Sequence, residues 1–340
     1  MFKHVYRYDD MKRQQHNAVR NSVGWYYYTH VLFEVTGEDA TAFMDLIYMM
    51  PIGTLSIGRA RYTPMLNDDA EILDDVVIFR MGEDKYWIST LFVLRVTKWL
   101  EDHKGGYKVE IRDITPEMDM YAVQGPKSKD LMNAILEESV DDQKFFQIKD
   151  NSINGISVKI SRAGFTGEKL GYEIYVAPED KEKIEVVLAE KGKAFDAVEV
   201  TEFQVMTWTL PTEKGFYVMT DIHWTNPFEV GFERGISWDK DFIGKEALLK
   251  IKEEGPKRKL LGFTISEEHD AVHIVPRNLG GPGAPVMLGD EEIGRTYKYT
   301  YGYTVEKNIG YALVEIDKVK IGDVVTINGA LATLTDKVFI

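Results

Sequence analysis

The sequence of 340 residues is long enough for two or three domains, and its 44% hydrophobic content is ordinary for chains that bury large cores. The 55 acidic residues exceed the 41 basic ones, and the net charge of -14 opposes non-specific binding to nucleic acid or anionic membranes. The absence of cysteine excludes disulfides, thiolate nucleophiles and cysteine-ligated metals. No apolar run reaches roughly 18 residues, and the charged, aromatic start does not resemble a secretory signal. We therefore expect a soluble, cytoplasmic protein without nucleic-acid or membrane partners.

Short β-rich runs alternate with amphipathic helical stretches along the chain, which favours an α+β fold. The first part predicts a strand over 25–35, a helix over 40–50 closed by Pro51, strands over 60–66, 72–80 and 86–89, and a helix over 91–103. The three consecutive strands predict an antiparallel meander. A strand, a Gly-Pro turn and a helix follow at 120–138, and a looser copy of this unit lies at 172–191.

A charged run at 250–259, KIKEEGPKRK, predicts a domain boundary. We expect residues 1–252 to form an α+β region of two intertwined subdomains that binds the ligands. The strand-rich remainder, 256–340, predicts a small β-barrel or sandwich.

Common signatures for phosphate, metal and serine chemistry do not appear. The glycines at 280, 281 and 283 alternate with prolines instead of opening a helix, and no nucleophile elbow of the G-x-S-x-G type occurs. His269 and His273 lie four residues apart but lack the glutamate of H-E-x-x-H, so we predict no metal site.

Two adjacent acids stand inside an apolar strand at 71–79. Alternation places Leu73, Asp75 and Val77 on one face and Asp74 and Val76 on the other. Because both faces are largely apolar, at least one carboxylate is expected to be partly buried, where an unpaired charge is costly. The acids either cap neighbouring backbone groups or belong to a functional site.

Aromatic density marks two further segments. In WYYYTH at 25–30, Tyr28 and His30 share a face of the predicted strand and could form the wall of a pocket for a flat ligand. The segment 217–224 contains Tyr217, His223 and Trp224. Both segments are equally compatible with a packed core.

Taken together and in order, these segments resemble the folate-dependent aminomethyltransferase family, whose namesake is the glycine cleavage T-protein. The resemblance covers roughly residues 25–320 and rests on shared motifs: ILDDVV at 72–77, YAVQGP at 121–126, RAGFTGE at 162–168, GYEI at 171–174, EKG at 213–215, PFE at 227–229 and DFIGKEAL at 241–248.

The resemblance implies a three-part fold around a central channel for tetrahydrofolate, with a C-terminal β-barrel. Asp75 matches the carboxylate beside the reacting N5 atom, and Tyr62 matches a pocket tyrosine. Glu173 matches the acid that accepts two hydrogen bonds from the pterin edge, a task that suits the two oxygens of a carboxylate. Val77 and Gln124 are further folate-binding candidates from the same motifs.

The chain also departs from the family pattern. One extra residue separates Glu168 from the GYEI motif, compared with the usual T-protein spacing. Pro211 stands where the family has an arginine two residues before E-x-G, and a basic residue near the end of the chain is expected to be missing. The folate tail must then be held by other groups.

The resemblance includes several activities. The stretch at 25–30 resembles vanillate-type O-demethylases, which favours methyl transfer from a small donor, a methoxylated aromatic, to N5 of tetrahydrofolate. A leaving phenoxide needs a proton donor, so His30 joins Asp75 and Tyr62 as catalytic candidates, and Tyr28, Tyr217, His223 and Trp224 are substrate-binding candidates. The alternatives are an aminomethyltransferase of the glycine-cleavage type and a non-enzymatic folate-binding regulator.

Overall fold

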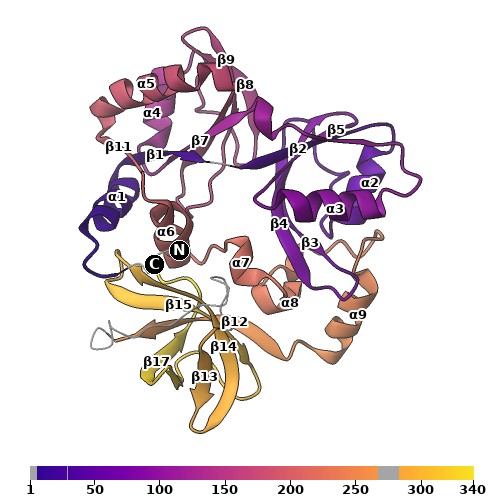
Figure 1. The fold of residues 1–340 in the computed structure, drawn as a ribbon, viewed down its shortest axis with the longest axis vertical. Coiled ribbons are helices and arrows are strands. Elements are labelled where there is room, and N and C mark those ends of the chain that lie inside the picture. The colour runs from indigo at the N-terminus through magenta and orange to yellow at the C-terminus, as the bar shows by residue number, and fades with distance from the viewer. Residues whose placement is uncertain (1–5, 29, 267–282) are drawn as a thin grey trace.

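The computed structural model describes residues 6–28, 30–266 and 283–340, and it arranges them as two α+β lobes beside a C-terminal barrel (Figure 1). Short helices lie between the lobes and the barrel. The predicted α+β class, with a C-terminal β-barrel, is confirmed. Within the described ranges, no helix has the length and apolar character needed to cross a membrane.

The first lobe is a five-stranded sheet covered by two helices on one face. Helix α2 (Ala40–Ile47) buries Phe43 and Met44, and α3 (Val93–His103) buries Val96 and Leu100, in one core with the sheet. The predicted antiparallel meander is present as β3, β4 and β5. In spatial order the strands are β3 (Ala60–Leu66), β4 (Ile72–Gly82), β5 (Lys85–Thr90), β2 (Val31–Thr36) and β6 (Glu110–Asp113).

The second lobe is a six-stranded sheet. Helices α4 (Ser128–Ile135) and α5 (Lys181–Gly192) place Leu131 and Leu188 in its core. The Gly-Pro turn joins β7 to α4, as the sequence predicts. In spatial order the strands are β11 (Ala197–Glu199), β1 (Val23–Tyr28), β7 (Asp119–Gln124), β10 (Gly171–Val176), β9 (Ile156–Ser161) and β8 (Ile148–Ile153).

The predicted single strand over 25–35 is wrong. It is two strands, β1 and β2, that belong to different sheets. Side chains from both sheets, including Leu32, Phe79, Trp87, Met120 and Tyr175, form one core between the lobes. The chain therefore crosses from one lobe to the other where local alternation predicts continuity.

A helical segment connects the lobes to the barrel. It contains a π-helical turn (Val205–Thr209) and the helices α6 (Leu210–Glu213), α7 (Met219–Ile222), α8 (Pro227–Val230) and α9 (Lys245–Glu254). Pro211 has no backbone N–H and so cannot donate the helical hydrogen bond to the Thr207 carbonyl. Lys298 Nζ donates to this carbonyl instead, at 3.4 Å.

The barrel closes in the order β12 (Arg258–Ile265), β15 (Lys307–Glu315), β14 (Glu291–Gly302), β13 (Pro285–Leu288), β16 (Val324–Ile327) and β17 (Ala330–Thr335).

Gly125, in the turn between β7 and α4, has a φ of +124°, and a Cβ there would lie 2.4 Å from the Val19 carbonyl oxygen. Because both strain and overlap oppose a side chain, Gly125→Ala should lower the free energy of unfolding by about 2–4 kcal/mol. Denaturant unfolding measures this change. Gly106→Ala is the matched control, since a Cβ at Gly106 meets no atom within 4 Å; equal losses in both variants would contradict this account.

Candidate active site

A cavity of about 410 Å³ lies where the two lobes meet the connecting segment and the chain end. Its volume is in the range of small-molecule sites. The lining is mainly apolar and aromatic, with a few carboxylates. It comprises Tyr28, Tyr62, Asp74, Asp75, Val76, Val77, Ser89, Thr90, Leu91, Met120, Phe145, Phe146, Ala163, Gly164, Phe165, Glu173, Gly215, Phe216, Tyr217, Val218, Met219, Phe232 and Lys337.

Strands β3 and β4 bring two acids to one side of the cavity. The Tyr62 hydroxyl donates to Asp75 Oδ2 at 2.5 Å, diagonally across the strand pair. Asp74 Oδ2 accepts from the Thr90 hydroxyl at 2.5 Å, and Asp74 Oδ1 accepts from the Asp75 N–H at 2.9 Å. Each carboxylate therefore has its own hydroxyl donor.

The alternation predicted for this strand fails at one residue. Register shifts between Met65 and Leu66 of β3, so that Leu73 of β4 is the extra residue of a bulge. Leu73 joins the core that contains Val76, instead of sharing a face with Asp75. The bulge changes the face of Leu73 alone, and the consecutive residues Asp74 and Asp75 both line the cavity.

Burial makes both acids harder to ionise. Burial and the neighbouring charge of Asp75 raise the pKa of Asp74 to about 8, against the hydrogen bond from Thr90. Burial raises the pKa of Asp75 to about 6, with the Tyr62 hydrogen bond acting in the opposite direction and the charge of Asp221 adding to the rise. Burial and the closeness of the two acids therefore disfavour a doubly charged pair near neutral pH.

Glu173 lies on β10 and is 8% exposed. Its Oε2 accepts from the Tyr175 hydroxyl at 3.0 Å, and burial raises its pKa to about 7. The ring of Tyr28 lies nearby in the lining, with its centre 4.5 Å from that of Phe165. A flat ligand could therefore contact aromatic rings while its edge faces a buried carboxyl group.

Gln124 is buried behind the cavity wall and is not among the described residues that line it. Its Nε2 donates to the Ala163 carbonyl at 3.1 Å, and its Oε1 accepts from the Thr166 hydroxyl at 2.9 Å. A Cβ on Gly164 would lie 1.9 Å from Gln124 Oε1, so this glycine is needed for close contact. The structure thus assigns Gln124 a bracing position behind the lining loop.

Lys337, near the end of the chain, lines the cavity. Its Nζ donates to the Tyr217 hydroxyl, lies 4.2 Å from the centre of that ring, and donates to the Val230 carbonyl at 3.4 Å. The expectation that no basic residue near the chain end serves the site is therefore wrong. Sequence reasoning missed Lys337 because its position at the cavity depends on how the residues after β17 fold back onto the connecting segment.

Several predicted site residues lie elsewhere. His30 is 4% exposed, its ring packs edge-on against Tyr175 at 5.6 Å, and it is not among the described lining residues. Burial lowers the pKa of His30, which disfavours the protonated form. The rings of His223 and Trp224 contact each other at a tilt, with centres 4.2 Å apart, and are also absent from the described lining. Tyr28 and His30 do not share a face of one strand, because β1 ends at Tyr28 and β2, in the other sheet, begins at Val31.

His269 and His273 lie outside the described residues. Among the residues that are described, no group of three or more His, Asp or Glu side chains could hold a metal ion.

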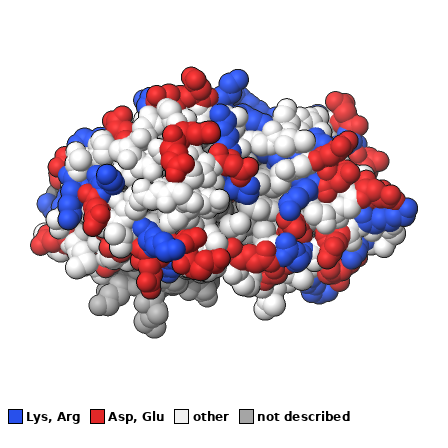
Figure 2. Space-filling model, turned by 90° about the horizontal axis from the view of Figure 1, so that it is seen from above, with Lys and Arg blue, Asp and Glu red and all other residues white. Residues whose placement is uncertain are grey.

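The rim of the cavity is apolar. Leu91, Phe145 and Phe216 belong to the lining but are 41%, 53% and 43% exposed. Figure 2, which views the molecule from above the lobes, shows acidic and basic side chains interspersed over that face. The exposed residues of the lining named above are therefore apolar.

Comparisons with known proteins agree with this architecture. The model of the GCVT N-terminal domain matches residues 2–240, and that of the glycine cleavage T-protein C-terminal barrel domain matches residues 258–339. This chain belongs to the glycine cleavage T-protein family. The aminomethyltransferases of Bacillus cytotoxicus and Alkaliphilus oremlandii are 32% and 33% identical to it, over 89% and 95% of this chain and 82% and 87% of theirs.

The fold of this T-protein family member is also that of a solved structure, the glycine cleavage system aminomethyltransferase T of Bartonella henselae. The match has a TM-score of 0.83 at 20% identity and covers 97% of this chain and 89% of the other. The chain is a folate-dependent one-carbon transferase of the T-protein type, and tetrahydrofolate is the folate that the family uses.

Exchanging Glu173 for glutamine should separate stability from binding. The pKa of Glu173 is about 7 when folded, against about 4.3 unfolded, so the folded protein holds an extra proton between these values and loses stability as pH rises through them. Without ligand, Glu173→Gln should therefore be about 1–3 kcal/mol more stable than the parent at pH 8 and equal to it at pH 4.

Denaturant unfolding at the two pH values tests this expectation, with the exposed Glu190→Gln as control. The same Glu173 variant should bind tetrahydrofolate more weakly by about 1–3 kcal/mol, because an acceptor oxygen becomes a donor. A variant that is less stable at pH 8, or that binds folate normally, would contradict the position assigned to Glu173.

Proposed function

We propose that the protein transfers an aminomethyl-type one-carbon group to tetrahydrofolate bound in the central cavity. Family membership and the joint position of Asp75 and Glu173 at one cavity carry this proposal. The names of the similar proteins, aminomethyltransferases of about one-third identity, support this choice of donor.

The residues present suit a reduced folate. Glu173 offers two carboxylate oxygens to the parallel N–H donors of a pterin edge, and those donors would favour its charged form. Tyr28 and Phe165 offer ring faces, and Lys337 offers a cation to an anionic portion of the ligand. Tetrahydrofolate, when bound, supplies the nucleophilic nitrogen that accepts the one-carbon unit.

Asp75 is the group best placed to assist transfer. Its carboxylate, held by Tyr62, stabilises positive charge on an aminomethyl donor or on the carbon that loses its leaving group. Burial and proximity disfavour two charges on Asp74 and Asp75, so the two adjacent acids present one negative charge. This arrangement favours a cationic donor.

A methoxylated aromatic remains the second candidate donor, because the rim residues Phe145 and Phe216 offer apolar surface for an aryl ring. The proton donor expected for that reaction, His30, lies away from the described lining. The aminomethyl donor therefore has the stronger support.

The product identifies the donor. The protein should be incubated with tetrahydrofolate and, separately, with an aminomethylated lipoyl carrier protein, methoxyaromatics, betaines and sulfonium compounds. An aminomethyl donor should yield ammonia and 5,10-methylenetetrahydrofolate, whereas methyl donors would yield 5-methyltetrahydrofolate. Formation of the methyl product alone would overturn the proposal in favour of a demethylase.

Asp75→Asn should lower turnover by about 10²–10⁴-fold, because it removes the negative charge that acts in the transition state. The affinity for tetrahydrofolate should change only a few-fold, since Glu173 and the aromatic rings remain. Turnover by the product assay and affinity by calorimetry measure the two effects. Asp84→Asn, in the exposed turn after β4, is the control; unchanged turnover in Asp75→Asn would remove this residue from the catalytic assignment.

His30→Ala tests the second candidate. If His30 only packs against Tyr175, the variant should lose about 1–3 kcal/mol of stability and keep its turnover per folded molecule. The half-buried His103→Ala is the matched control. A large loss of turnover with methoxyaromatics, at full occupancy of the folded state, would instead restore His30 as a proton donor.

A further inference from the structure

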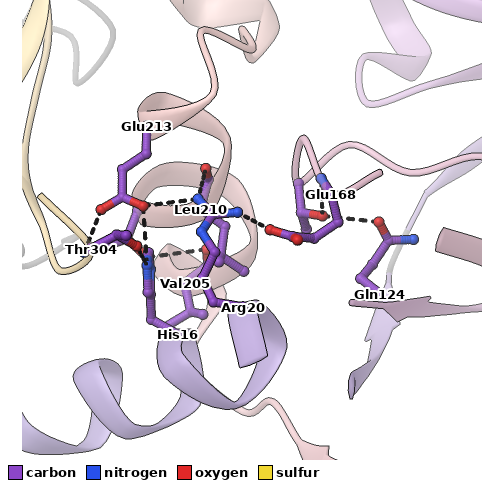
Figure 3. Close-up of polar contacts among 10 residues, drawn as sticks. His16, Arg20, Gln124, Glu168, Val205, Leu210, Glu213 and Thr304 are labelled. Atoms are coloured by element: carbon purple, nitrogen blue, oxygen red, sulfur yellow. Dashed lines mark hydrogen bonds and ion pairs between the residues drawn. The ribbon is translucent and has the colours of Figure 1, made fainter. Parts of the chain in front are cut away.

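A buried cluster of charged side chains lies behind the cavity wall (Figure 3). Its centre is Arg20, near the end of helix α1 (Asp10–Asn21), whose side chain is 8% exposed. Arg20 Nη1 forms an ion pair with Glu168, and Nη2 donates to Glu213 Oε2 at 2.9 Å and to the Leu210 carbonyl at 2.8 Å. Both acids are at most 10% exposed.

The two acids belong to two different parts of the cavity wall. Glu168 lies in the loop between β9 and β10, whose Ala163, Gly164 and Phe165 line the cavity. Glu213 directly precedes the segment from 215 to 219, which also lines it. The guanidinium of Arg20 is thus a bridge between two walls that come from the second lobe and the connecting segment.

Glu213 extends this bridge to the barrel and to the chain end. Its Oε1 accepts from the Thr304 N–H at 2.7 Å, and its Oε2 lies 3.2 Å from Nε2 of the buried His16. The Glu213 carbonyl accepts from the Phe339 N–H at 2.9 Å, two residues after the cavity residue Lys337. Burial opposes the charge on Glu213, but the hydrogen bond and charge of His16, together with the charge of Arg20, lower its pKa to about 2.

We propose that Arg20 is a positioning residue for folate binding: its guanidinium, paired with Glu168 through one nitrogen and with Glu213 through the other, sets the spacing of the two cavity walls. The inference rests on the proposal that tetrahydrofolate occupies the cavity. Arginine suits this task because its planar fork holds two carboxylates at once, whereas a lysine ammonium is a single point charge.

The test compares Arg20→Gln, Arg20→Lys and the double variant Arg20→Gln/Glu168→Gln with Arg13→Gln. Arg13 is the matched control, because it lies on the same helix but its contacts, with Glu306 at 3.5 Å, the Arg7 carbonyl at 3.0 Å and the rings of Tyr301 and Tyr303, include no cavity-lining residue. Arg20→Gln should weaken tetrahydrofolate binding about tenfold and leave the maximal turnover within about threefold. Arg20→Lys should not restore affinity, and the double variant should recover part of it because one unpaired buried acid is removed.

Hydrogen exchange without ligand adds a measurement that a general loss of stability does not reproduce. In Arg20→Gln, exchange should rise in both 163–168 and 213–219 while the barrel strands stay unchanged. Normal affinity in Arg20→Gln, full rescue by lysine, or an equal affinity loss in Arg13→Gln would overturn the inference. If Arg20→Gln does not fold, Glu168→Gln replaces it, because this variant breaks the bridge but leaves the ion pair between Arg20 and Glu213 intact. Normal tetrahydrofolate affinity and normal exchange in Glu168→Gln would equally overturn the inference.

The same experiment separates the two proposals. If tetrahydrofolate protects neither wall from exchange in the parent protein, the cavity is not the folate site and the proposed function fails. If it protects both walls but Arg20→Gln binds normally, only the role of Arg20 fails.

Discussion

The cavity withdraws Asp74, Asp75 and Glu173 from bulk water, and the surrounding structure must make that burial tolerable. An ionised carboxylate in an apolar environment is costly unless it is hydrogen-bonded or neutralised. Hydroxyl donors from Thr90, Tyr62 and Tyr175 respectively reach the three acids. Because these donors stand on strands, the acids are held by the rigid parts of the fold and not by loops.

Two carboxylates come from the first lobe and one from the second, so no single lobe can form the site. The lobes are joined by a shared apolar core that includes Leu32, Phe79 and Tyr175. The connecting segment closes the remaining side, where Tyr217 and Phe232 meet Tyr62 through a chain of ring contacts of 5.6–5.9 Å. The site geometry therefore depends on how the units pack together, which explains the ion pairs buried at their junctions.

Pro211 illustrates how such a junction is stabilised. Proline cannot donate the backbone hydrogen bond that a regular helix needs, and the chain forms a π-helical turn just before it. Lys298 from the barrel reaches the Thr207 carbonyl, and Arg20 from α1 reaches the Leu210 carbonyl. Cations from two other parts of the protein thus meet carbonyls around the position where the resembled family has an arginine.

Local sequence patterns predicted the elements that local forces determine. Alternation and turn residues located the meander of β3, β4 and β5, and the resemblance placed Asp75, Tyr62 and Val77 on it, where the structure finds them at the cavity. The same reasoning failed for the single strand predicted over 25–35, because an aromatic, β-branched run looks the same whether or not it changes sheets. It also failed for Lys337, whose position depends on contacts between distant segments.

Asp74 and Asp75 show why two adjacent acids need not have the same role. Burial raises the pKa of both acids, and the charge of Asp75 raises that of Asp74 further, against the hydrogen bond from Thr90. Asp75 faces the cavity and accepts from Tyr62, which favours its carboxylate form. Environments that push two pKa values apart assign a neutral and a charged role to the same residue type. Both acids line the cavity, and burial together with their proximity disfavours two charges, so the pair presents a single negative charge to a cationic donor.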